Sequence, residues 1–294
     1  MFKKIFLVIL AILGGILTLG SQGAYDSTFF TEEDTRLPVT LSYVAWDTEI
    51  ASTNVLETVL EDEGFNVDLV QLDPAIMFSS VASGETDASV SVWAPNTHAS
   101  YLDRYGDQVE NLGVHTPGAI TGMVVPEYMD VNSIAELSDE AGQEIVGIEP
   151  GAGVVEQTRN ALDHYDNLSD WSLSTSSTGA MLTTLEQALQ NEEEIVITGW
   201  SPHWIFLEYD LKYLEDPDGM YGEGEELETI VRAGLQEENP IAYEIIDNFA
   251  WEASDMEQVM VYIQDGMEPQ EAAERWVEEN PELVAEWTEG IPAE

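Results

Sequence analysis

The 294-residue sequence contains no cysteine and only eight lysine and arginine residues. Without cysteine there can be no disulfide, no thiolate metal site and no lipid-bearing cysteine as an anchor. Against the eight basic residues stand 58 aspartates and glutamates, so the formal net charge at pH 7 is −50. Nucleic acid and anionic lipid repel such a surface, and we expect no nucleic-acid partner.

The common catalytic signatures are also missing. There is no GxSxG serine and no HxxxH or HExxH histidine pair, and pairs of carboxylates carry no information among 58 acids. The acid-rich stretches 191–194 and 223–228 are expected to be solvated faces rather than metal sites. We therefore expect a non-enzymatic protein with no metal and no cofactor. A carbohydrate-active enzyme with a tryptophan-lined cleft is the one enzymatic alternative.

The N-terminus has the order of an export signal. Lys3 and Lys4 precede an apolar run from Ile5 to Leu19, which is followed by small residues. The run is only slightly shorter than a membrane span, so an uncleaved anchor is the alternative. We expect a signal or anchor segment at 1–24 and a linker at 25–38, and an exported protein whose tether is open.

The exported part is even more acidic. Six basic residues lie beyond the signal against all 58 acids, and 6 − 58 gives a net charge of −52. Such self-repulsion destabilises a compact chain unless salt screens it. The composition therefore indicates a saline habitat.

Strand–helix alternation predicts two α/β lobes. The expected elements are strands at 39–45, 65–72, 88–93, 144–148, 171–175 and 194–199, with helices at 50–63, 74–83, 154–162 and 179–190 between them. Such alternation predicts parallel sheets covered by helices. Crossings at 119–129 and 227–233 would place lobe 1 at 39–118, completed by C-terminal helices at 236–290, and lobe 2 at 119–235. A bilobed plan with a two-segment hinge closes around a ligand.

Three of the eight tryptophans share one setting. Trp46 (LSYVAWDTE), Trp93 (ASVSVWAPNTH) and Trp200 (EIVITGWSPHW) each stand at or near the end of a short apolar strand. Ligands bind at this edge of open α/β sheets, and aromatic faces attract poorly hydrated cations such as quaternary ammonium groups. A single tryptophan of this kind is more often a core residue. Trp171, Trp251, Trp276 and Trp287 are expected to pack in the core.

Four motifs carry a family resemblance. YVAWDTEIASTNV, VWAPNTHASYLDRYG, VGIEPGAGV and TGWSPHWIFLEYDLKYLEDP resemble segments of glycine-betaine-binding proteins, the extracellular receptors of osmoprotectant ABC importers. The resemblance runs from about Leu41 to the C-terminal WTEG. It implies a type II periplasmic-binding-protein-like fold on the outer face of the cytoplasmic membrane or in a periplasm. Its partners would be a membrane permease and the permease's ATPase subunit.

The resemblance also implies a ligand site. Trp46, Trp93 and Trp200 would cage the trimethylammonium group of glycine betaine or a related quaternary ammonium carboxylate. Gly147 and Ile148 match residues whose main-chain N–H groups bind the carboxylate, and His98 matches a third donor. Trp46, Trp93 and His98 would then lie on one lobe, and Trp200, Gly147 and Ile148 on the other.

Two nearby features have competing interpretations. The GIEPGAG segment mimics a dinucleotide loop, but Glu156 occupies the third glycine position and would repel a pyrophosphate. We expect Gly151 and Gly153 to serve a tight turn. His203 and Trp204 are expected to support the site or to pack.

A receptor for choline or carnitine is the second binding alternative. For choline, which lacks a carboxylate, an acid in the cage would replace the carboxylate donors. Asp47 is the only acid adjacent in sequence to a cage tryptophan.

Overall fold

The computed structural model describes residues 36–291, so the predicted signal segment and nearly all of the predicted linker lie outside the described part of the chain. The strands follow the order β2-β1-β3-β9-β4-β7-β5-β6, with β8 paired to β4. Their bounds are β1 Val39–Tyr43, β2 Val67–Gln71, β3 Ala88–Ala94, β4 Val109–Pro126, β5 Glu144–Gly147, β6 Ser172–Thr175, β7 Val196–Ser201, β8 Leu211–Tyr213 and β9 Glu225–Arg232.

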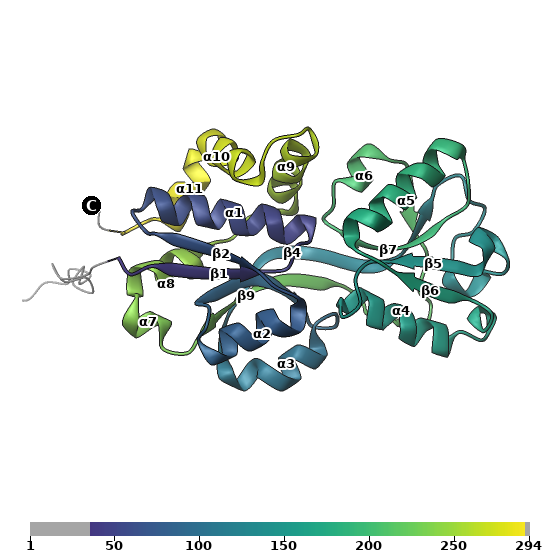
Figure 1. Ribbon diagram of the computed structural model, residues 1–294, viewed down its shortest axis with the longest axis horizontal. Coiled ribbons are helices and arrows are strands. Elements are labelled where there is room, and N and C mark those ends of the chain that lie inside the picture. Colours follow the sequence, from purple (N-terminus) through teal and green to yellow (C-terminus); the bar gives the residue numbers. More distant parts are fainter. Residues whose placement is uncertain (1–35, 292–294) are drawn as a thin grey trace, which may run out of the picture. The chain divides into compact units, whose positions relative to one another are not determined.

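Lobe 1 is built on the first five strands of this order. β1 pairs in parallel with β2 and β3, as the alternation predicts, but β9 is inserted antiparallel between β3 and β4. α1 (Asp47–Asp62), α9 (Ala253–Gln264) and α10 (Pro269–Glu279) cover one face. α2 (Pro74–Ser83) and α3 (Ala99–Tyr105) cover the other (Figure 1). The C-terminal helices thus complete this lobe.

Lobe 2 repeats the plan on a smaller sheet. β5 pairs in parallel with β6 and β7, while the second half of β4 pairs antiparallel with β7 and β8. α4 (Gly153–His164) and α5 (Thr178–Asn191) flank this sheet (Figure 1). The short helices are α6 (Ile205–Glu208), α7 (Leu235–Glu238), α8 (Pro240–Asn248) and α11 (Pro281–Trp287).

The chain passes between the lobes twice. β4 pairs with β9 as far as Ala119 and with β7 from Ile120 onward, and the second passage lies between Tyr213 and Glu225. The return crossing predicted at 227–233 is wrong, because β9 already pairs with β3 and β4 of lobe 1 from Glu225 onward. The predicted bilobed α/β fold is therefore confirmed. The sheets are mixed rather than purely parallel, because β4 and β9 run antiparallel to their neighbours. The residue limits of the lobes as separate domains stay predictions.

The tryptophans expected to pack do so. Trp276 and Trp287 stack with ring centroids 5.9 Å apart, and Trp251 meets Trp276 edge-on at 5.2 Å. All three are at most 4% exposed. Trp171 is also buried, and its indole N–H donates to the Ser138 carbonyl. Trp251, Trp276 and Trp287 form an aromatic core among the C-terminal helices α8 to α11.

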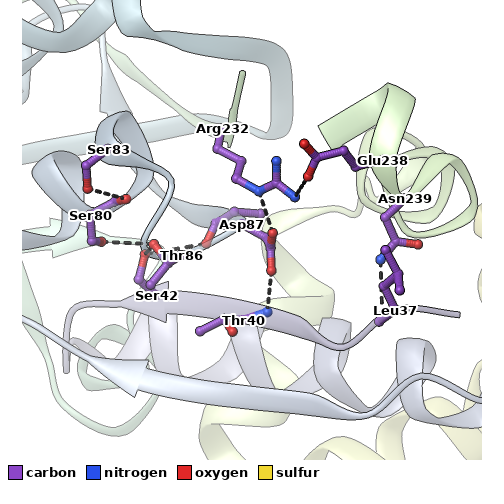
Figure 2. Close-up of polar contacts among 11 residues, drawn as sticks. Leu37, Thr40, Ser42, Ser80, Ser83, Thr86, Asp87, Arg232, Glu238 and Asn239 are labelled. Atoms are coloured by element: carbon purple, nitrogen blue, oxygen red, sulfur yellow. Dashed lines mark hydrogen bonds and ion pairs between the residues drawn. The ribbon is translucent and has the colours of Figure 1, made fainter. Parts of the chain in front are cut away.

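One of the few cations ties lobe 1 together (Figure 2). Arg232 Nε, on β9, donates to Asp87 Oδ1 at 2.6 Å, and Arg232 Nη2 lies 2.8 Å from Glu238 on α7. The second oxygen of Asp87 accepts the backbone N–H of Thr40, on β1, at 2.8 Å. Two carboxylates and one guanidinium thereby join three segments that are distant in sequence.

Among residues 36–291, no helix is both long and apolar enough to span a bilayer. The same residues hold no group of three or more acidic or histidine side chains arranged to bind a metal ion.

Candidate functional site

An apolar cavity lies between the two lobes. Trp46, Trp93 and Trp200 all line it, together with Ile148 and the first turn of α4. Its only polar lining side chains are those of two threonines, Thr97 and Thr121, and none of the described residues that line it is charged. The structure therefore brings the three predicted cage residues to one place.

Local structure explains how the tryptophans arrive there. β3 is buried along its whole length and ends one residue after Trp93, while Trp200 is the penultimate residue of β7. Trp46 occupies the N-cap position of α1, three residues after the end of β1. Each ring is 3–5% exposed, so almost all of its surface faces protein or the cavity.

Two of the three indoles donate to a carboxylate. Trp93 Nε1 lies 2.6 Å from Glu49 Oε1, and Trp46 Nε1 donates to Glu149 Oε1 from across the lobes. The Trp200 Nε1–H has no hydrogen-bond partner among the described residues, and its ring packs edge-on against His203 with centroids 4.6 Å apart. The three walls are therefore electrostatically unequal.

Sequence reasoning missed both carboxylates. Glu49 is 1% exposed, and burial raises the pKa of its carboxyl to about 7 against hydrogen bonds from Thr48 and Trp93. Glu149 accepts the N–H and the hydroxyl of Thr178 at 3.2 and 3.1 Å. Glu49 and Trp93 are far apart in sequence, so no local pattern announces their contact.

Asp47 does not face the cavity as the acid of a choline cage would. Its carboxylate accepts the Trp204 indole N–H at 2.8 Å and lies 3.5 Å from His203 Nε2. Burial alone would raise the pKa of the Asp47 carboxyl, but the nearby His203 ring and the hydrogen bond from Trp204 outweigh burial and lower it. His203 and Trp204 thus join lobe 2 to the start of α1.

His98 has one free donor. Its Nδ1 accepts the backbone N–H of Trp93 at 3.0 Å, which fixes the neutral tautomer with the proton on Nε2. Nε2 is buried and has no partner among the described residues. Burial lowers the pKa of His98 to about 3, so the ring is neutral at physiological pH. The ring stacks on Trp46 with centroids 5.8 Å apart.

The predicted main-chain donors lie at the end of β5. Ile148 lines the cavity, and its N–H donates to the Thr198 hydroxyl at 3.2 Å. Gly147 is buried and precedes Ile148 as the last residue of the strand, outside the lining. A side chain at Gly147 would come within 3.0 Å of Leu173, so close packing explains the glycine.

Comparison with known proteins decides the family. The family described as the substrate binding domain of ABC-type glycine betaine transport systems matches residues 38–279. The chain belongs to this family. Over 157 residues the chain is 46% identical to the glycine betaine/carnitine transport binding protein GbuC of Listeria monocytogenes serotype 1/2a (strain 10403S). That match covers 53% of this chain and 52% of GbuC, so the chain spans about half the length of this curated relative.

Two solved structures are similar to this chain over most of its length. The closed, glycine betaine-bound lactococcal OpuAC is 48% identical, with a TM-score of 0.85 over 87% of this chain and all of that one. A choline-binding protein of an ABC transporter, solved with choline, is 25% identical with a TM-score of 0.82 over 87% of this chain and 93% of that one.

Gly151 and Gly153 of this substrate-binding domain are required for different physical reasons. Gly151 adopts a φ of +98°, a conformation that only glycine holds without strain, so it serves the predicted turn. Gly153 has no such φ, and the turn explanation is wrong for it. A Cβ at Gly153 would lie 2.2 Å from the carbonyl oxygen of Thr97, on the other lobe. Gly153 therefore permits contact between the lobes.

The acid-rich stretch 223–228 is not wholly a solvated face of the substrate-binding domain. Glu225 is 2% exposed, because its carboxylate accepts the N–H groups of Asn96 and Thr97 and the Thr97 hydroxyl. These bonds fix the segment between Trp93 and His98. The acidic composition concealed this contact because Glu225 stands among exposed acids.

Proposed function

We propose that the protein is the extracytoplasmic receptor of an ABC importer and binds glycine betaine or a related quaternary ammonium carboxylate. One observation carries this proposal: three tryptophans from both lobes line an uncharged cavity, and the neutral ring of His98, whose buried Nε2–H has no partner among the described residues, stacks on Trp46. Ring faces suit a trimethylammonium group, and a buried donor without a partner suits a carboxylate.

The proposed binding mode uses both ends of the ligand. The cation contacts Trp46, Trp93 and Trp200, while the carboxylate accepts hydrogen bonds from His98 Nε2–H and from the Gly147 and Ile148 amides. The Ile148 N–H would turn from the Thr198 hydroxyl to a charged acceptor, which forms a stronger hydrogen bond. Because the ligand contacts both lobes, it favours the arrangement in which they meet.

Partners and location follow from the family. We infer that the ligand-bound protein delivers betaine to a membrane permease driven by an ATPase subunit. It would do so outside the cytoplasmic membrane or in a periplasm. We also infer that the protein has no enzymatic activity. No carboxylate lines the cavity among the described residues, so a glycosidase pair of acids has no counterpart there.

Choline is the alternative ligand, and the structural similarity to a choline-binding protein supports this alternative. A site for choline would be expected to present an acid to the cavity, whereas Asp47 is held by Trp204.

Titration by tryptophan fluorescence or calorimetry with glycine betaine, choline and carnitine tests the proposal. We expect betaine to bind most tightly. His98→Ala should weaken betaine by about 1.5–3 kcal/mol, the range for a hydrogen bond to a charged group, and should leave choline nearly unchanged. His164→Ala is the matched control, because His164 is exposed and bonds to Asp218. Tighter binding of choline than of betaine, or no saturable binding, would reject the proposal.

A further inference from the structure

We propose that Glu49 and Glu149 make the cavity selective for cations by acting through the indoles of Trp93 and Trp46, without touching the ligand. This inference rests on the proposed function, because it concerns the same site. The cavity wall is uncharged, but in two of its three aromatic walls a carboxylate accepts the indole N–H at the edge of the ring.

Glu49 is built into the fold as an acceptor. It lies in the first turn of α1, is fully enclosed, and has one oxygen on Trp93 Nε1 and the other on the Thr48 hydroxyl. Structural stability alone does not explain a buried acid here, since burying a carboxylate without a cation is unfavourable. The side chains of Arg159, Arg232, Arg275, His164 and His203 each pair with a carboxylate other than Glu49.

Glu149 serves the second wall from the opposite lobe. One oxygen accepts the Trp46 indole N–H, and the other accepts the backbone N–H and hydroxyl of Thr178 at the start of α5. Glu149 is half-buried, so water screens its charge more than that of Glu49. Both carboxylates are thus fixed in position by donors other than the ligand.

The physical effect has two parts. A carboxylate that accepts the indole N–H polarises the ring, which increases the negative potential of its face toward a cation. The carboxylate charge also acts directly across a few ångströms of water-poor protein, where a unit charge is weakly screened. A cation in the cavity gains from both effects and needs no acid beside it. Trp200 lacks such a carboxylate, so its wall should contribute less.

The experiment compares glycine betaine with tert-butylacetate, its carbon analogue, which has the same shape and carboxylate but no cation. Affinities are measured at pH 8, where Glu49 is ionised, for the parent protein, Glu49→Gln and Glu149→Gln. Competition against betaine measures the weaker ligand. Glu57→Gln is the matched control: Glu57 lies two turns further along α1, and burial also raises its pKa to about 7, but its electrostatic neighbours are Glu61 and Tyr43 rather than a tryptophan.

We expect Glu49→Gln to weaken betaine by about tenfold, or about 1.4 kcal/mol, and to strengthen tert-butylacetate, because a negative charge near an anionic ligand is removed. Glu149→Gln should act in the same direction with a smaller change, and Glu57→Gln should alter neither ligand. Glutamine retains an oxygen that accepts the indole N–H, and melting curves verify the fold.

Parallel losses of both ligands in Glu49→Gln would show a merely structural role and overturn the inference. Unchanged betaine affinity, or the same shifts in Glu57→Gln, would also overturn it. Failure of the parent protein to bind betaine would instead reject the proposed function, so the two failures are distinguishable.

Discussion

The protein contains two groups of three tryptophans, and both groups are buried. In the aromatic core, Trp251, Trp276 and Trp287 touch one another through ring contacts of 5.2 and 5.9 Å. In the cavity, Trp46, Trp93 and Trp200 make no ring contact with each other among the described residues and surround a space instead. Exposed fraction alone would not separate the two groups.

Hydrogen bonding distinguishes two of the three cavity indoles from the aromatic core, whereas the indole N–H groups of Trp200, Trp251 and Trp276 have no partner among the described residues. The Trp287 N–H donates to a main-chain carbonyl, that of Ala250, at 2.9 Å. Trp46 and Trp93 donate to carboxylates, which are expensive to bury and therefore need a reason to be there. Packing suffices for the tryptophans of the aromatic core, whereas the proposed cation cage would also benefit from the carboxylates at the indole edges of Trp46 and Trp93.

The substitution with the largest expected effect is Trp276→Ala. Removing a fully buried tryptophan from the aromatic core should lower the free energy of unfolding by about 3–5 kcal/mol, because it leaves a cavity. The variant that remains folded should bind betaine like the parent. Chemical denaturation and titration measure the two effects. A loss of affinity in the folded variant would break the division between the groups.

Gly153→Ala should affect only the cavity group. The new methyl group would overlap the Thr97 carbonyl, and overpacking of this kind typically costs about 1–3 kcal/mol in the arrangement where the lobes meet. Betaine affinity should fall about fivefold to 150-fold, while the unfolding of the ligand-free protein should change little. Gly179→Ala is the control, because Gly179 lies near the start of α5, the next α-helix in the chain, with open space at its Cβ. Equal effects of both substitutions would contradict this explanation.

Each cavity tryptophan should have a moderate effect on binding. Trp46→Ala, Trp93→Ala and Trp200→Ala each remove an aromatic wall worth about 0.5–2 kcal/mol, so betaine should bind roughly threefold to thirtyfold more weakly. Phenylalanine at the same positions should cost less, since it keeps a ring face. Isothermal titration measures the series. Parent-like affinity in all three alanine variants would remove the cage.

Salt should change the stability of the fold strongly and the affinity for betaine least of all the tests. The net charge of −52 beyond the signal predicts a melting temperature that climbs steeply up to about 1 M salt, where the Debye length is near 3 Å. Betaine affinity, measured where the protein is fully folded, should change little because bulk ions reach the enclosed cavity poorly. A flat melting temperature would refute the halophilic interpretation.

The sequence allowed the lobes, the helix positions and the strand-end tryptophans to be predicted, because periodicity and turn residues are local signals. The strand at 109–118 escaped prediction, since Gly113, Gly118 and a proline interrupt its pattern and its ladder to β9 shifts register repeatedly. Glu49, Glu149 and Glu225 could not be recognised because their partners are distant in sequence. Among 58 acids, nothing local marks three as buried.

The place of β9 in the sheet order also determines how the protein can assemble. The sheet of lobe 2 uses only residues 120–213, so its strands can pair as soon as that stretch is present. Lobe 1 must wait, because β9 pairs Val231 with Ala88 and Arg232 with Val109 and so fills the gap between β3 and β4. Until then both strands present open edges, which are the sites where strands join wrong partners. We therefore expect a chain that emerges from its N-terminus to complete lobe 2 before lobe 1. Completion of lobe 1 would be the slow, aggregation-sensitive step.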